Sequence, residues 1–261
     1  MTFAAYRGLF KTVVKEDMLN FFGDSMPSAV VTLVHCLVTV SIYAAVQKTL
    51  FYGIFSWGMM VWYLIFAQVI LSAGKGIIKE INADIQTGAV ATAMSKPYSY
   101  PLSLYATFLG SIPMELFGTL LIVIPFGIFM GGAMLQAHAI LFGVLLVFFA
   151  VTINFLISLC IGMIAFWTED ADPYMWLYSK LMFLVGGMFF PLDVFPATIG
   201  VIVKALPPAF IIYYPAKLLV KFSWSEFLYV AGMQLLYIAL LSSIAYLMFK
   251  RATKKVMVNG G

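Results

Sequence analysis

Charged side chains are scarce in this sequence: only 10% of its 261 residues are Asp, Glu, Lys or Arg. None occurs over residues 116–168, and residues 25–47, 49–74 and 227–249 are also uncharged. A soluble domain keeps a polar face toward water, whereas about 20 apolar residues suffice to cross the roughly 30 Å hydrocarbon core of a bilayer. We therefore predict an integral membrane protein, with two successive spans inside residues 116–168.

Sequence signals for catalysis, metal binding and disulfides are also missing. The two cysteines, Cys36 and Cys160, lie in apolar segments, which indicates neither a disulfide framework nor a metal site. No GxxxxGK[ST] loop, H-E-x-x-H or GxSxG motif is present, and His35 and His138 are the only histidines. We expect a chain that is not an enzyme and carries no cofactor. The net charge of +4 is small and lies near span ends, so no nucleic-acid partner is expected.

The apolar segments predict an all-α polytopic fold in a single domain, residues 1–261. Six spans are expected, at about 28–47, 54–73, 102–130, 137–166, 174–190 and 227–249. Residues 191–226 are punctuated by five prolines, and their uncharged runs are too short to cross. They are expected to form short re-entrant or interfacial helices that return to the side they left.

Lysine and arginine predict the orientation of the chain, because they are enriched on the cytoplasmic side of a membrane. In this layout eleven of them fall on one side and four on the other. The first set is Arg7, Lys11, Lys15, Lys75, Lys79, Lys96, Lys180, Lys250, Arg251, Lys254 and Lys255, and the second is Lys48, Lys204, Lys217 and Lys221. Both termini are therefore expected in the cytoplasm.

Two segments are predicted to be amphipathic helices outside the spans. Residues 1–24 combine helical apolar periodicity with a basic stripe, which is typical of an elbow helix on the membrane surface or of a plain topology anchor. Residues 74–101 place Ile78, Ile81 and Ile85 on one helical face and polar residues, among them Asn82, on the others. Gly88 is expected to end that helix, which suits either docking of a cytoplasmic partner or a contact with lipid headgroups.

Glu115 is the acidic residue placed in the middle of a predicted span. Ionised carboxylates are costly in lipid, so such a residue is expected to face the bundle interior, a cavity or a partner, or to make a structural hydrogen bond. His35 is a candidate partner for it, or a second group lining a substrate path.

Three sets of residues resemble the permeases of bacterial ABC transporters of the type-2 exporter class. The first set matches the pattern D-I-x-x-G … L-x-[RK]-P-x-S-Y-P, although the family more often has arginine where Lys96 stands. The matching segments are 84–88 and 95–101, then 166–170, and finally 186–187, 190–196, 206–207 and 214–216. They keep the order and spacing of the family over nearly the whole chain.

This resemblance implies a six-helix permease of the bacterial inner membrane with cytoplasmic termini, an elbow helix at 1–24, a coupling helix within 74–101 and extracellular re-entrant helices within 191–226. Such permeases export their cargo as dimers, often with a second permease chain, above separate ATPase subunits that hold ATP and Mg²⁺. The implied ATPase contacts are Glu80, Asp84, Gly88, Lys96, Pro97, Glu169 and Asp170.

Two other functions remain open. An ion- or proton-coupled secondary transporter could use Glu115, although the two halves of the chain show no convincing internal repeat. A membrane scaffold without transport activity could assemble partners through residues 74–101.

Overall fold

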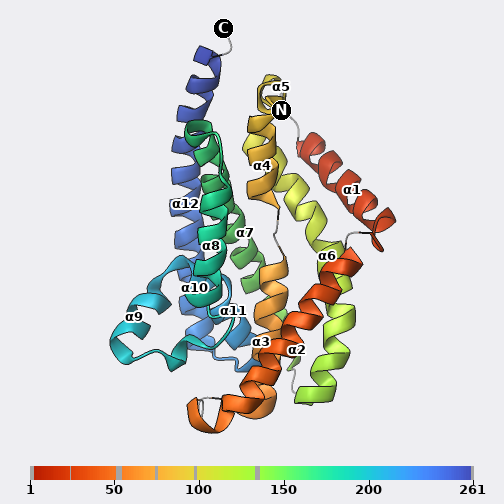
Figure 1. Cartoon of the computed structure of the whole chain (residues 1–261), viewed down its shortest axis with the longest axis vertical. Helices are drawn as coiled ribbons and strands as arrows, with labels where there is room; N and C mark the ends of the chain where they lie inside the picture. Colours follow the sequence, from red (N-terminus) through yellow and green to blue (C-terminus); the bar gives the residue numbers. More distant parts are fainter. Residues whose placement is uncertain are drawn as a thin grey trace.

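The computed structural model is a bundle of α-helices (Figure 1), described over residues 3–23, 25–50, 55–73, 76–96, 99–132 and 136–259. Five helices are long and apolar enough to cross a membrane, or six if one bent pair counts as a span. The chain is therefore an all-α polytopic membrane protein, as predicted. The helices are α1 (Phe3–Leu19), α2 (Ser25–Leu50), α3 (Trp57–Ser72), α4 (Ile77–Gln86), α5 (Ala89–Ser95), α6 (Tyr100–Gly131), α7 (Ala137–Thr168), α8 (Asp172–Leu184), α9 (Ala197–Ala205), α10 (Pro207–Ile211), α11 (Tyr213–Val220) and α12 (Trp224–Asn259), with the short 3-10 helix η1 (Leu192–Val194) before α9.

Helix α3 is the central helix of the bundle. Twelve of its sixteen residues are buried, because α2, α6, α7 and α11 pack around it. The peripheral helices α2, α6 and α12 bury few of their residues, and the others are wholly or partly exposed, as expected for surfaces that face lipid. Position in the bundle, rather than composition, separates the core helix from the outer ones.

The region predicted as the fifth span differs from the expectation for residues 174–190. Helix α8 has only 13 residues and is followed by turns over residues 185–190. Gly186 and Gly187 lie in these turns, and the φ angle of Gly187 is 80°, a conformation that glycine adopts at little cost. The carbonyl of Gly187 accepts a hydrogen bond from the hydroxyl of Tyr63 in the core.

The proline-rich region 191–226 forms short helices, as predicted. The segment α9 and the segment running from α10 through α11 are bent by 70° at Leu206. They lie on the α12 side of the bundle, in its lower half in Figure 1.

The start of α1, α4, α5 and the carboxyl end of α12 lie at one end of the bundle (Figure 1), here called the α4 end. Helix α4 follows α3 in nearly the same direction, so the two helices are stacked end to end in Figure 1. Helix α1 packs along α6, and α12 packs along α7.

Candidate functional site

The residues predicted to contact an ATPase gather at the α4 end. Glu80 and Asp84 lie on α4, while Glu169 and Asp170 lie in the turn between α7 and α8. Gly88 separates α4 from α5 with a φ angle of 73°, which explains why a glycine stands there. Lys96 caps the end of α5, and Pro97 lies outside the described residues.

Asn82 connects α4 to the turn between α7 and α8. Its amide nitrogen donates to Oδ1 of Asp170 at 3.1 Å and to Oδ1 of Asp172 at 3.3 Å. Its carbonyl oxygen accepts from the backbone N–H of Ala171 at 3.0 Å. The side chain is only 5% exposed, so this polar residue of α4 faces the turn rather than water. The two predicted contact segments are consequently parts of one connected surface.

The turn itself has a distinctive backbone. Glu169 ends α7 in the left-handed conformation, with a φ angle of 65°, and its N–H still donates to the carbonyl of Ala165. Oδ1 of Asp170 also accepts from the backbone N–H of Asp172 at 2.9 Å. The carboxylate of Asp170 thus holds the start of α8 in addition to α4.

Asp84 connects α4 to α6. Its Oδ2 accepts a hydrogen bond of 2.8 Å from the hydroxyl of Tyr100, which lies in the first turn of α6 and is 4% exposed. Just before that helix, the N–H of Ser99 donates to the hydroxyl of Tyr6 on α1 at 3.1 Å. A displacement of α4 therefore acts on α6 as well as on the turn after α7.

Helices α4 and α7 approach closely at Gly162. A Cβ atom at this position would lie 2.8 Å from Cδ1 of Ile81 and 3.0 Å from its Cβ. Because a Cβ atom at this distance would force the side chain of Ile81 to shift, glycine on α7 permits the close approach of the two helices. Ile81 is fully buried there, in agreement with the apolar face predicted for the segment.

Sequence reasoning missed Asn82, Tyr100 and Gly162 as determinants of this site. Asn82 lies two residues before the first matching segment and Tyr100 lies inside the second, but the partner of Asn82 at Asp170 is 88 residues away in the sequence. In the sequence, the only sign that Asn82 has a role in this site was its place directly after Ile81, a residue of the predicted apolar face.

The two candidates for a substrate path lie apart from this end. Glu115, halfway along α6, accepts a hydrogen bond from the hydroxyl of Ser28 at 3.5 Å. Ser28 belongs to the first turn of α2, where the helix dipole favours a negative charge. His35 lies two helical turns further along α2, and its side chain is exposed.

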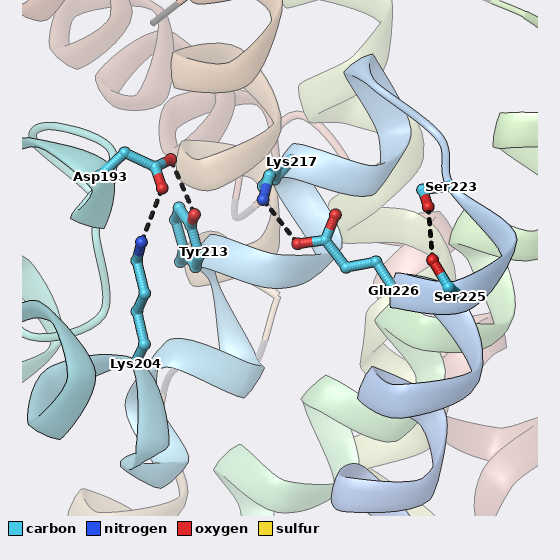
Figure 2. Close-up of polar contacts among 7 residues, drawn as sticks. All are labelled: Asp193, Lys204, Tyr213, Lys217, Ser223, Ser225 and Glu226. Atoms are coloured by element: carbon cyan, nitrogen blue, oxygen red, sulfur yellow. Dashed lines mark hydrogen bonds and ion pairs between the residues drawn. The ribbon is translucent and has the colours of Figure 1, made fainter.

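A second polar cluster ties together the short helices of region 191–226 (Figure 2). Asp193 in η1 pairs with Lys204 of α9 at 2.7 Å and accepts from the hydroxyl of Tyr213 at 2.7 Å. Lys217 of α11 pairs with Glu226 in the first turn of α12 at 2.6 Å. Both pairs thus connect elements adjoining the bend, and the amines of Lys204 and Lys217 lie 5.7 and 5.6 Å from the centre of the Tyr213 ring.

The pKa of Asp193 is shifted by these neighbours. Burial alone raises it, but the hydrogen bonds from Lys204 and Tyr213, together with the charges of Lys204 and Lys217, bring the pKa below the ordinary value of 3.8. The carboxylate is therefore ionised at neutral pH and holds η1 against α9 and α11.

Among the described residues, no group of three or more His, Cys, Asp or Glu side chains is placed to hold a metal ion. A search of curated proteins found no match to the chain. A family model does match it, over residues 26–260, and its description is "ABC-2 family transporter protein". The match includes every span and the whole α4 end except α1. The chain therefore belongs to the ABC-2 family of transporter proteins.

Proposed function

We propose that this permease component of an ABC transporter works as an exporter in the bacterial inner membrane, with a second permease chain, and docks a separate ATPase subunit at its α4 end. The ATPase would bind ATP and Mg²⁺, and both termini would be cytoplasmic. The observation that carries the proposal is the set of hydrogen bonds made by Asn82, because they unite α4 with the turn between α7 and α8.

The connections of α4 suit the transmission of movement. Asn82 joins it to the turn before α8, Asp84 joins it to α6, and the Ile81–Gly162 contact presses it against α7. An ATPase that moves α4 or α5 would therefore transmit that movement to α6, α7 and α8 together. A switch of this kind requires rigid elements with two discrete arrangements, which the close packing at Gly162 favours.

Family membership favours this function over the two alternatives left open by the sequence. An ion-coupled transporter would need Glu115 in a relay, whereas its carboxylate accepts a hydrogen bond from Ser28 at a helix amino terminus and so belongs to the contact between α6 and α2. A scaffold would require no transmission between α4 and the spans.

The test is co-purification of the ATPase subunit from the native host. Charge reversal by Glu80→Lys, combined with Asp84→Asn, should reduce the ATPase recovered per permease by about tenfold, since charged contacts fix partner choice. Asparagine at position 84 retains a carbonyl oxygen that accepts from Tyr100, so the link to α6 is preserved.

Glu16→Lys serves as the matched control, because Glu16 is an exposed acid on α1, outside the proposed contact. Retention of the ATPase by the double variant, at the level of this control, would place the contact elsewhere. An absence of any ATPase in the wild-type preparation, across detergents and nanodiscs, would reject the proposed function itself.

A further inference from the structure

A partly open cavity of about 530 Å³ lies between the end of α3 and the start of α4, flanked by α7 and α8. Its volume falls in the range of small-molecule binding sites, about 300–1,000 Å³. The cavity is lined by Leu71, Gly76, Ile77, Ile78, Lys79, Asn154, Ser158, Met175, Tyr178, Ser179, Met182 and Phe183. Neither the family match nor the predicted contact residues assign a role to it.

The apolar part of the lining comes from α3, α4 and α8, whereas α7 contributes Asn154 and Ser158. Leucine, isoleucine, phenylalanine and methionine side chains form the walls, and methionine adapts readily to the shape of a ligand. Helix α8 provides one wall but is loosely attached, since Met182 is its only buried residue. The cavity therefore suits the apolar part of a ligand. Helix α8 can move outward when the ligand enters.

Two buried polar side chains present hydrogen-bond donors to this apolar space. Ser158 is 4% exposed, and in the described part of the chain its hydroxyl has no hydrogen-bond partner. Asn154 is 5% exposed, and its Oδ1 accepts from the hydroxyl of Tyr178 at 2.6 Å. This bond orients the amide so that its NH₂ group remains to donate, and the described residues provide no acceptor for it. Neither donor atom is among the fully buried, unpaired atoms of the described residues, so both are accessible from the cavity, where a ligand acceptor can bond to them.

Lys79 also belongs to the lining, and its charged side chain is exposed at the edge of α4. Among the described residues, its ammonium group makes no ion pair. Ser179 contributes no further donor, because its hydroxyl already donates to the carbonyl of Met175 at 2.9 Å. The polar groups of the cavity are thus two neutral donors and one cation, which together select an end rich in acceptor oxygens and negatively charged.

We propose that this cavity binds an acidic amphiphile, a molecule with an apolar chain and a carboxylate or phosphate end. Binding of the amphiphile does not depend on the proposed function. Its identity as the transported cargo does rest on that function. Ile77, Ile78 and Lys79 of the lining immediately precede Glu80 on α4, so movement of α4 changes the cavity directly. Cargo binding and ATPase docking would then share one helix.

The test uses the full chain in nanodiscs of phosphatidylcholine and the fluorescent acid dansylaminoundecanoic acid as the probe. Saturable binding is expected, measured as the fluorescence increase over empty nanodiscs. The variants Ser158→Ala and Lys79→Gln should each raise the Kd about tenfold, as expected for the loss of a hydrogen bond to a charged group. The methyl ester of the probe should lose a similar factor on the wild-type chain.

The matched controls are Ser243→Ala and Lys254→Gln, which remove the same groups from exposed positions on α12 and should leave the Kd unchanged. Binding that does not saturate, or that the Ser158→Ala, Lys79→Gln double variant leaves intact, would overturn the proposal. Adding phosphatidylglycerol to the nanodiscs distinguishes two sources: competition identifies a bilayer lipid as the occupant, and its absence identifies a freely exchanging amphiphile. The assay contains no ATPase, so its failure leaves the proposed docking untouched, and loss of docking leaves probe binding intact.

Discussion

Asn82 on α4 and Asp170 in the turn after α7 are joined by a hydrogen bond of 3.1 Å, although 88 residues separate them in the sequence. The same asparagine accepts from the backbone of Ala171, so one side chain fixes both the turn and the start of α8. Two segments with separate motifs thereby become one mechanical unit.

Asn82→Ala should loosen this unit without unfolding the bundle. The N–H of Ala171 would lose its acceptor, at a cost of about 1–3 kcal/mol for a buried unsatisfied group. We expect faster hydrogen exchange of the peptide that contains residues 168–172, measured by mass spectrometry in nanodiscs. Thr87→Ala is the control, since that exposed hydroxyl bonds only to its own helix, at Ala83. Equal exchange in both variants would mean that the turn holds its own conformation.

Gly162→Ala should displace α4 from α7. The added methyl group would lie 2.8 Å from Cδ1 of Ile81, and overpacking of this kind costs about 1–3 kcal/mol. The Tm in detergent should fall, and Gly162→Ala combined with Ile81→Ala should lower it by less than the sum of the two single losses. Gly232→Ala on α12 meets no atom within 4 Å and should leave the Tm at or above that of the wild type. A Tm unaffected by Gly162→Ala would show that the α4–α7 contact adjusts freely.

Glu115→Gln should impair transport more than it lowers the Tm. The amide oxygen can still accept from Ser28, so the contact between α6 and α2 persists, while the negative charge beside the amino terminus of α2 is lost. Transport in vesicles and thermal unfolding are to be measured on the same preparations, with Ser28→Ala as the variant that removes only the bond. Wild-type transport by Glu115→Gln would leave this carboxylate with a structural role alone.

Protonation of Asp193 at acid pH should weaken the packing of η1 against α9 and α11. Its pKa is lower in the folded chain than the ordinary 3.8, so its stabilising effect is complete above that value and is lost as the pH falls through the folded pKa. The Tm of the wild type should therefore fall below about pH 4 more steeply than the Tm of Asp193→Asn. Parallel curves for the two proteins would indicate that other carboxylates dominate the acid response.

The spans were predictable from sequence because length and apolarity alone determine what crosses a bilayer. The exception is the region predicted as the span 174–190, where the composition stays apolar beyond the end of α8. There the helix ends at Leu184, and Gly187 turns the chain so that its carbonyl meets Tyr63. A hydropathy pattern carries no information about that long-range partner.

The candidate site was predictable in its parts but not in its assembly. The apolar face of α4 followed from the spacing of its isoleucines, and burial of Ile78 and Ile81 confirms it. The burial of Asn82 was not predictable, because an asparagine on an amphipathic helix is polar whether it meets water or a distant aspartate. Only the fold brings Asp170 to it.

Helix α12 is about 54 Å long at 1.5 Å per residue over its 36 residues, well beyond the roughly 30 Å of hydrocarbon. Its carboxyl end stands clear of the other helices at the α4 end, as Figure 1 shows. A protein that approaches α4 and α5 must accordingly fit beside this projecting end of α12, which carries Lys250, Arg251 and Lys254. The length and positive charge of the projecting helix limit the shapes and the angles of approach that any docking subunit can have.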